Sequence, residues 1–196
     1  AGALKLLVAG QACISPLRLY VPNILKSAFE ETLCGRVEKL QTGNGMEEGI
    51  GVGPLVNDSA VVKVEQQVED AREKGAGVPV GGVRLTGGEH ANGHFFAPTV
   101  LTNVQPHMTI YREETFGPVA PVIGYDDADE VIELANDTNY GLAAYVYTRD
   151  IAVAMRAFEK LRFGIIGIND VNPTSASVPF GGMGDSGIGR DGGHEG

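Results

Sequence analysis

The feature that most constrains the fold is an alternation of short apolar runs and amphipathic stretches over residues 77–168. The runs at residues 143–148 and 164–168 are continuously apolar, which is typical of strands buried on both faces of a sheet. Residues 151–161, which lie between them, are expected to form a helix that Asp150 caps. Strands that alternate with helices build mostly parallel sheets. The sequence therefore predicts a layered α/β domain with a mostly parallel sheet.

Two helices are expected before this region. Residues 23–40 have apolar residues near helical spacing, and residues 57–75 combine an apolar stripe with a charged face, with Asn57 or Asp58 as the N-cap. Pro98 lies inside an extended stretch and favours an edge or a bend there. The other expected elements are strands at residues 78–83, 95–104 and 122–125, a helix at 127–134, and a loop from 170 to 196.

Composition excludes several classes of partner. The formal net charge of −10 makes nucleic acid an unexpected partner, since binding to phosphate backbones needs clustered Lys and Arg. The apolar spans are too short to cross a membrane. Two cysteines, Cys13 and Cys34, do not form a disulfide framework and indicate a reducing, cytoplasmic setting. The four histidines show no metal-ligand spacing, so no metal is expected.

One glycine-rich pattern invites a functional interpretation that its context contradicts. Residues 182–187 spell G-x-G-x-x-G. The pattern does not directly follow a strand and opens no clear helix, which a dinucleotide-binding loop requires. A turn-rich loop is the expected structure.

Cys13 is the candidate nucleophile. It lies among small and turn-forming residues between Gly10 and Pro16, which places it on a loop. An exposed cysteine close to backbone amides can react as a thiolate. The alternative is a half-buried thiol without chemistry, because free cysteine is commonly a small core residue. Composition alone favours this alternative.

Read together, several segments resemble the aldehyde dehydrogenase superfamily, and the likeness extends over essentially the whole chain. The Cys13 segment and the Glu114–Pro118 segment are the most specific of them. The segments that carry the resemblance are Gly10-Gln11-x-Cys13 with Arg18 and Val21, Gly53-Pro54-Leu55, Pro98-Thr99-Val100, Glu114-Thr115-Phe116-Gly117-Pro118, Asn136 with Tyr140-Gly141-Leu142, residues 164–169, and Pro179-Phe180-Gly181-Gly182 running to Arg190.

This resemblance implies a role for each site residue. Cys13 corresponds to the nucleophile that forms a thiohemiacetal and then a thioester with the aldehyde. Glu114 corresponds to the acid that binds the nicotinamide-side ribose of NAD or NADP, and Phe116 to the aromatic side chain that packs against that end of the cofactor. Thr174, Ser175 and Phe180 correspond to the wall of the substrate tunnel.

The resemblance also implies an organisation for the chain. Residues 1–196 are expected to form the catalytic domain, a three-layer α/β/α domain, without the N-terminal cofactor-binding domain and the C-terminal oligomerisation strand. The expected substrate is succinate semialdehyde or another small oxygenated aldehyde. The full-length protein is expected to be a homo-oligomer, and the isolated domain to be inactive. The alternative is a catalytically silent domain that acts as a folded interaction module.

Overall fold

In the computed structural model, which describes residues 5–194, the chain divides into one unit of residues 1–125 and a second of residues 126–196. A four-stranded sheet organises the first unit in the order β1 (Leu19–Pro22), β8 (Val119–Tyr125), β7 (Thr99–Thr102) and β4 (Gly77–Val80). β8 runs parallel to both β1 and β7, and β4 is antiparallel to β7. The predicted α/β fold with a mostly parallel sheet is therefore confirmed.

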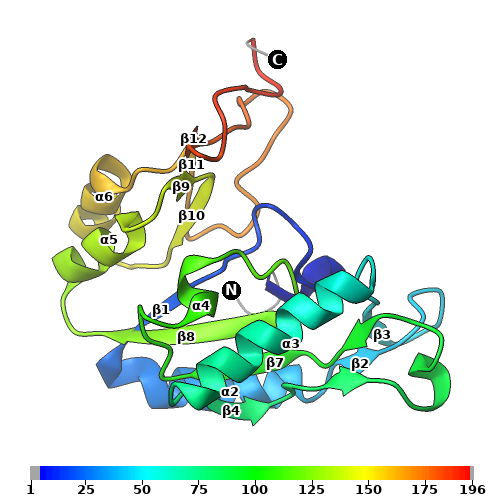
Figure 1. Cartoon of the computed structure of the whole chain (residues 1–196). Coiled ribbons are helices and arrows are strands. Elements are labelled where there is room, and N and C mark those ends of the chain that lie inside the picture. The colour runs from blue at the N-terminus through cyan, green and yellow to red at the C-terminus, as the bar shows by residue number, and fades with distance from the viewer. Residues whose placement is uncertain (1–4, 195–196) are drawn as a thin grey trace. The chain divides into compact units, whose positions relative to one another are not determined.

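The sheet of the first unit is buried on both faces. Along β8, Val119 and Ile123 belong to a core cluster that includes residues of α3 (Asp58–Glu73). Ala120 and Val122, which alternate with them, belong to a second cluster that includes residues of α2 (Asn23–Val37). Side chains alternate between the two faces of a strand, so α2 and α3 cover opposite faces, as the first unit in Figure 1 shows. The unit has three layers.

The helices α3, α5 (Ala128–Asn136) and α6 (Ile151–Lys160) each begin after a residue whose side chain caps them. Asn57 accepts a hydrogen bond from the Ala60 N–H at 2.9 Å and begins α3. The buried face of α3 carries the apolar stripe seen in the sequence: Val61, Val64, Val68 and Ala71. α2 also ends close to its predicted limit.

Two predicted strands of the first unit are shorter than expected. The extended stretch at residues 95–104 breaks into β6 (Phe95–Phe96) and β7, because Pro98 has no N–H to continue a ladder. β4 ends before Gly81, which has a φ of +74° and packs so closely on Pro98 that a side chain would overlap its carbonyl. β6 pairs with β5 (Arg84–Leu85), and β2 (Gln41–Thr42) pairs with β3 (Ile50–Val52).

The second unit contains a parallel pair joined by a helix. β10 (Ala143–Val146) leads into α6 (Ile151–Lys160), which returns to β11 (Ile165–Ile168). Asp150 caps α6 by accepting hydrogen bonds from two backbone N–H groups. α5 (Ala128–Asn136) precedes this motif, and β9 (Tyr140–Gly141) pairs with β12 (Met183–Gly184). The predicted terminal loop thus contains one short strand.

Candidate functional site

Cys13 lies exposed in a turn between the 3₁₀ helix η1 (Leu7–Gly10) and β1. The Ser15 N–H donates to the Ala12 carbonyl at 2.9 Å and closes the turn around the thiol. Val8 precedes it with a φ of 51°, a left-handed conformation that is costly for a β-branched residue. The predicted loop position of Cys13 is confirmed, and its exposure differs from the half-buried alternative.

The side chain of Gln11 fastens this loop to a neighbouring segment. Its Oε1 accepts a hydrogen bond from the Val56 N–H at 2.9 Å, and its Nε2 donates to the Pro54 carbonyl at 3.2 Å. One amide therefore satisfies a donor and an acceptor of the same segment. This pair of bonds restrains the backbone two residues before Cys13.

Gly10 brings the Cys13 loop into direct contact with the segment that carries Glu114. A Cβ atom at Gly10 would overlap the carbonyl oxygen of Gly117, and the φ of Gly10 is +75°. Only glycine permits both the conformation and this approach of two backbones. The structure therefore brings together two of the segments that the sequence singled out.

Glu114 and Phe116 both lie exposed after α4 (Thr109–Arg112), and Thr115 between them is buried. Phe116 is 38% exposed and has a φ of 49°, an uncommon conformation for a residue other than glycine. The alternation presents a carboxylate and an aromatic ring on the exposed side of one short segment. Strain of this kind is often stored at functional sites.

A tyrosine pair links the strand after Cys13 to the helix before Glu114. The hydroxyl groups of Tyr20 in β1 and Tyr111 in α4 are 2.8 Å apart. The Arg18 guanidinium lies 5.7 Å from the centre of the Tyr20 ring and 5.2 Å from that of Tyr111, within cation–π range. Burial raises the pKa of Tyr20 well above its ordinary value, so this hydroxyl keeps its proton.

Lys5 is a buried charged residue that the motif reasoning missed. Its side chain has no exposed surface, and its Nζ has no hydrogen-bond partner among residues 5–194. Burial lowers the pKa of Lys5 to about 8, and the carboxylate of Glu114 acts in the opposite direction. The available signal was a lone basic residue between Leu4 and Leu6.

The three predicted tunnel residues lie in the second unit. Thr174 is half-buried and donates a hydrogen bond to the Asn172 side chain at 3.1 Å. Ser175 is exposed, and its hydroxyl lies 3.0 Å from that of Ser177. Phe180 is half-buried and is held by backbone hydrogen bonds with Asp191 in both directions. These three residues occupy one short stretch of the chain.

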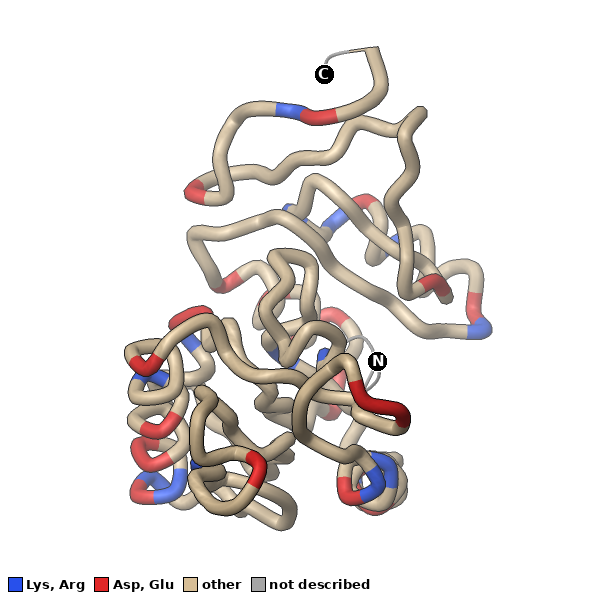
Figure 2. Tube along the Cα trace, turned by 90° about the vertical axis from the view of Figure 1, so that its right-hand side faces the viewer, with Lys and Arg blue, Asp and Glu red and all other residues tan. Residues whose placement is uncertain are grey.

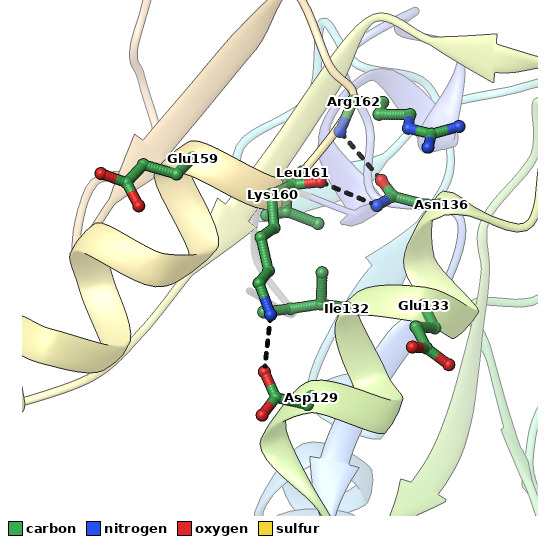
Figure 3. A pocket seen from close by; sticks show the side chains of 8 residues that line it. All are labelled: Asp129, Ile132, Glu133, Asn136, Glu159, Lys160, Leu161 and Arg162. Carbon is green, nitrogen blue, oxygen red and sulfur yellow. Dashed lines mark hydrogen bonds and ion pairs between the residues drawn. The ribbon is translucent and has the colours of Figure 1, made fainter.

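A hollow of about 470 Å³ lies between α5 and α6 of the second unit, and no predicted site residue lines it (Figure 3). Lys160 donates a hydrogen bond to Asp129 at 3.2 Å across it, and this bond lowers the pKa of Asp129. The Asn136 side chain donates to the Lys160 carbonyl and accepts from the Arg162 N–H. These contacts join α5 to α6 and to the residues that follow α6, so their role is structural.

Charge and metal-binding groups are dispersed within each unit. Figure 2 shows Lys and Arg interspersed with Asp and Glu, as along α3. Within residues 5–194, no three His, Cys, Asp or Glu side chains lie where they could hold a metal ion together. Over the same residues, no helix is both long and apolar enough to span a bilayer.

The α/β fold, the exposed Cys13 thiol and the Glu114 segment packed against its loop agree with the protein family that the sequence matches. Residues 3–196 match the model of the aldehyde dehydrogenase family, and the chain belongs to this family. A probable NADP(+)-dependent succinate-semialdehyde dehydrogenase from Sinorhizobium fredii is 45% identical over 188 residues, which cover 96% of this chain and 38% of that protein.

Solved structures give the same result. The succinate-semialdehyde dehydrogenase from Burkholderia pseudomallei has a TM-score of 0.93 at 44% identity, over 99% of this chain and 40% of that chain. Betaine aldehyde dehydrogenase from Staphylococcus aureus, in complex with NAD+, has a TM-score of 0.93 at 41% identity, over 99% and 39%. The chain thus spans about two-fifths of the length of these relatives.

Proposed function

We propose that residues 1–196 form the catalytic domain of an NAD(P)-dependent aldehyde dehydrogenase, with Cys13 as the nucleophile. The observation that carries this proposal is the contact between the Cys13 loop and the Glu114 segment through Gly10 and Gly117. It holds an exposed thiol and an exposed carboxylate on two segments that touch. Family membership supports the same assignment.

In the proposed reaction, the Cys13 thiolate attacks the aldehyde carbon and forms a C–S bond, which gives a thiohemiacetal. The negative charge that develops on the aldehyde oxygen is assigned to the backbone N–H of Cys13 as one donor. A nicotinamide cofactor held by Glu114 and Phe116 would supply the acceptor for the hydride that leaves this adduct. The remaining thioester is released from Cys13 by water as a carboxylic acid. Gln11 and Gly10 keep the loop in place during these steps.

The residues of the Glu114 segment are suited to a nicotinamide nucleotide. Glu114 is an exposed acceptor that can bind ribose hydroxyl groups, and Phe116 presents a ring surface two residues later. One relative described above is named for NADP(+) and a solved structure described above contains NAD+, so the proposal is for NAD or NADP.

The proposed substrate is succinate semialdehyde or another small oxygenated aldehyde. The hydroxyl groups of Thr174 and Ser175, which are assigned to the tunnel wall with Phe180, supply polar contacts for such a molecule. The relatives named above include enzymes for an anionic and a cationic aldehyde, so the assay must compare substrates of different charge. We further propose a homo-oligomeric full-length protein acting in the cytoplasm, where both free cysteines stay reduced.

The test is a panel of anionic, neutral and cationic aldehydes, assayed with the full-length protein and either NAD or NADP. Cys13→Ser is expected to lower kcat by roughly a thousand-fold or more, the scale on which loss of a nucleophile acts. Cys34→Ser is the matched control, because Cys34 lies on α2, and should retain activity. Full activity of Cys13→Ser would refute the proposal.

The competing function is a folded interaction module without catalysis. Glu114→Gln separates the two, since it keeps the size of an exposed side chain and removes its charge. The dehydrogenase proposal predicts that this variant binds the cofactor about ten-fold more weakly, as expected for loss of a hydrogen bond to a charged group. Unchanged cofactor affinity together with no turnover of any aldehyde would favour the module.

A further inference from the structure

Lys5 is the one lysine among residues 5–194 that the structure buries completely. Its Nζ makes no hydrogen bond within the described part of the chain. An ammonium group in the protein interior is unfavourable unless an anion or hydrogen-bond acceptors compensate it. The position of Lys5 therefore calls for an electrostatic partner.

The backbone carbonyl of Lys5 contacts the Cys13 loop. Ser15, which closes the Cys13 turn, donates its hydroxyl to the Lys5 carbonyl at 3.3 Å. A Cβ atom at Gly10 would lie 3.2 Å from the same carbonyl and would overlap the carbonyl of Gly117. The backbone of Lys5 is thus packed where the Cys13 loop meets the Glu114 segment.

The carboxylate of Glu114 raises the pKa of Lys5 and so offsets part of the effect of burial. Its carboxylate is exposed, whereas the ammonium is buried. A free glutamate samples several rotamers, and ordering it on ligand binding costs conformational entropy. A positive charge that attracts the carboxylate would reduce this cost by limiting its rotamers before a ligand binds.

We propose that Lys5 is a positioning residue for Glu114: its buried ammonium attracts the carboxylate and holds it beside the Cys13 loop, ready for a nucleotide ribose. This inference rests on the proposed function, in which Glu114 binds that ribose. Lys5 itself does not touch substrate or cofactor, because it has no exposed surface. Its effect is therefore on the affinity for the nucleotide through Glu114.

The test is a double-mutant cycle on the full-length protein, with Lys5→Met, Glu114→Gln and the double variant. The dissociation constant of NADH or NADPH is measured by the fluorescence of the reduced nucleotide, without turnover. Lys5→Met is expected to weaken binding by about five-fold, the effect of a partly screened charge pair. In the Glu114→Gln background the same substitution should change the constant by less than about two-fold. Lys5→Arg should restore most of the loss.

Ser15→Ala is the matched control, because it removes the hydrogen bond to the Lys5 carbonyl and leaves the charge in place. It is expected to keep nucleotide affinity within about two-fold of wild type. Equal weakening by Lys5→Met with Glu or Gln at position 114 would show that Lys5 acts through packing alone, and would overturn the proposal. A loss on Ser15→Ala as large as that of Lys5→Met would also overturn it.

A second measurement keeps the proposal testable if the variants do not fold or the protein binds no nucleotide. Carbon-13 NMR of the lysine Cε follows the titration of Lys5 in wild type and in Glu114→Gln. The attraction predicts a lower pKa of Lys5 in Glu114→Gln, and an unchanged pKa overturns it. Absence of nucleotide binding in the wild type refutes the proposed function, whereas the NMR result still decides whether Lys5 and Glu114 interact.

Discussion

Replacing Lys5 by Met should stabilise the fold at neutral pH. Methionine is of similar length, lacks the ammonium group, and suits a site with no exposed surface. Burial lowers the pKa of Lys5 from 10.5 to about 8. Each unit of this pKa difference is worth 1.36 kcal/mol, so the buried charge lowers the free energy of unfolding by about 3 kcal/mol.

The sign of the pH dependence follows from proton binding. Between pH 8 and 10.5 the unfolded chain keeps the proton on Lys5, whereas the folded chain loses it. Stability rises with pH where the unfolded state binds more protons. The cost is therefore fully present below pH 8 and disappears as the pH rises to 10.5. Relative to Lys5→Met, the wild type should gain about 3 kcal/mol over this range.

The assay is urea unfolding of both proteins, followed by circular dichroism at several values between pH 7 and 10.5. Other lysines contribute equally to both proteins and cancel in the difference. Lys63→Met is the matched control, because Lys63 is exposed on α3. If the difference in the free energy of unfolding between wild type and Lys5→Met does not change with pH, the argument that the buried ammonium destabilises the fold is refuted.

Three further outcomes are expected. Cys13 should be alkylated faster than Cys34, because Cys13 is exposed and burial raises the pKa of the Cys34 thiol; mass spectrometry that finds Cys34 modified first contradicts this. Gly10→Ala should destabilise the first unit by about 2 kcal/mol or more, measured by urea unfolding, because its Cβ would overlap Gly117 at a positive φ; a change below about 0.5 kcal/mol would be inconsistent with the described contact. Asn136→Ala should cost about 2 kcal/mol in thermal unfolding, since it removes two hydrogen bonds that join α5 to the end of α6, and an unchanged Tm would exclude this.

Much of the fold follows from local signals in the sequence. Asn57, Asp127 and Asp150 each precede an amphipathic stretch, and each caps the helix that begins there. The two continuous apolar runs formed the parallel pair β10 and β11, which is only partly buried, whereas β8 of the four-stranded sheet is largely buried. Strand limits were less predictable, because they depend on contacts such as that of Gly81 with Pro98, which are distant in the sequence.

The candidate site was predictable only in part. Cys13 and Glu114 stand out through the motifs around them, and the structure places both on exposed, adjoining segments. Lys5 carries no motif, and a lone basic residue between two leucines does not reveal that its side chain is buried. The hydroxyl contact of Tyr20 with Tyr111 joins residues 91 positions apart, which no local pattern reveals.

The approach of Gly10 to Gly117 has a mechanical consequence. Where side chains separate two loops, their rotamers can adjust and absorb a displacement of either loop. At this point one backbone lies against the other, with no side chain between them. A displacement of the Phe116 segment therefore displaces the Cys13 loop as well. The spacing of the two backbones at this point is set by peptide geometry, so it can persist while the surrounding core residues change.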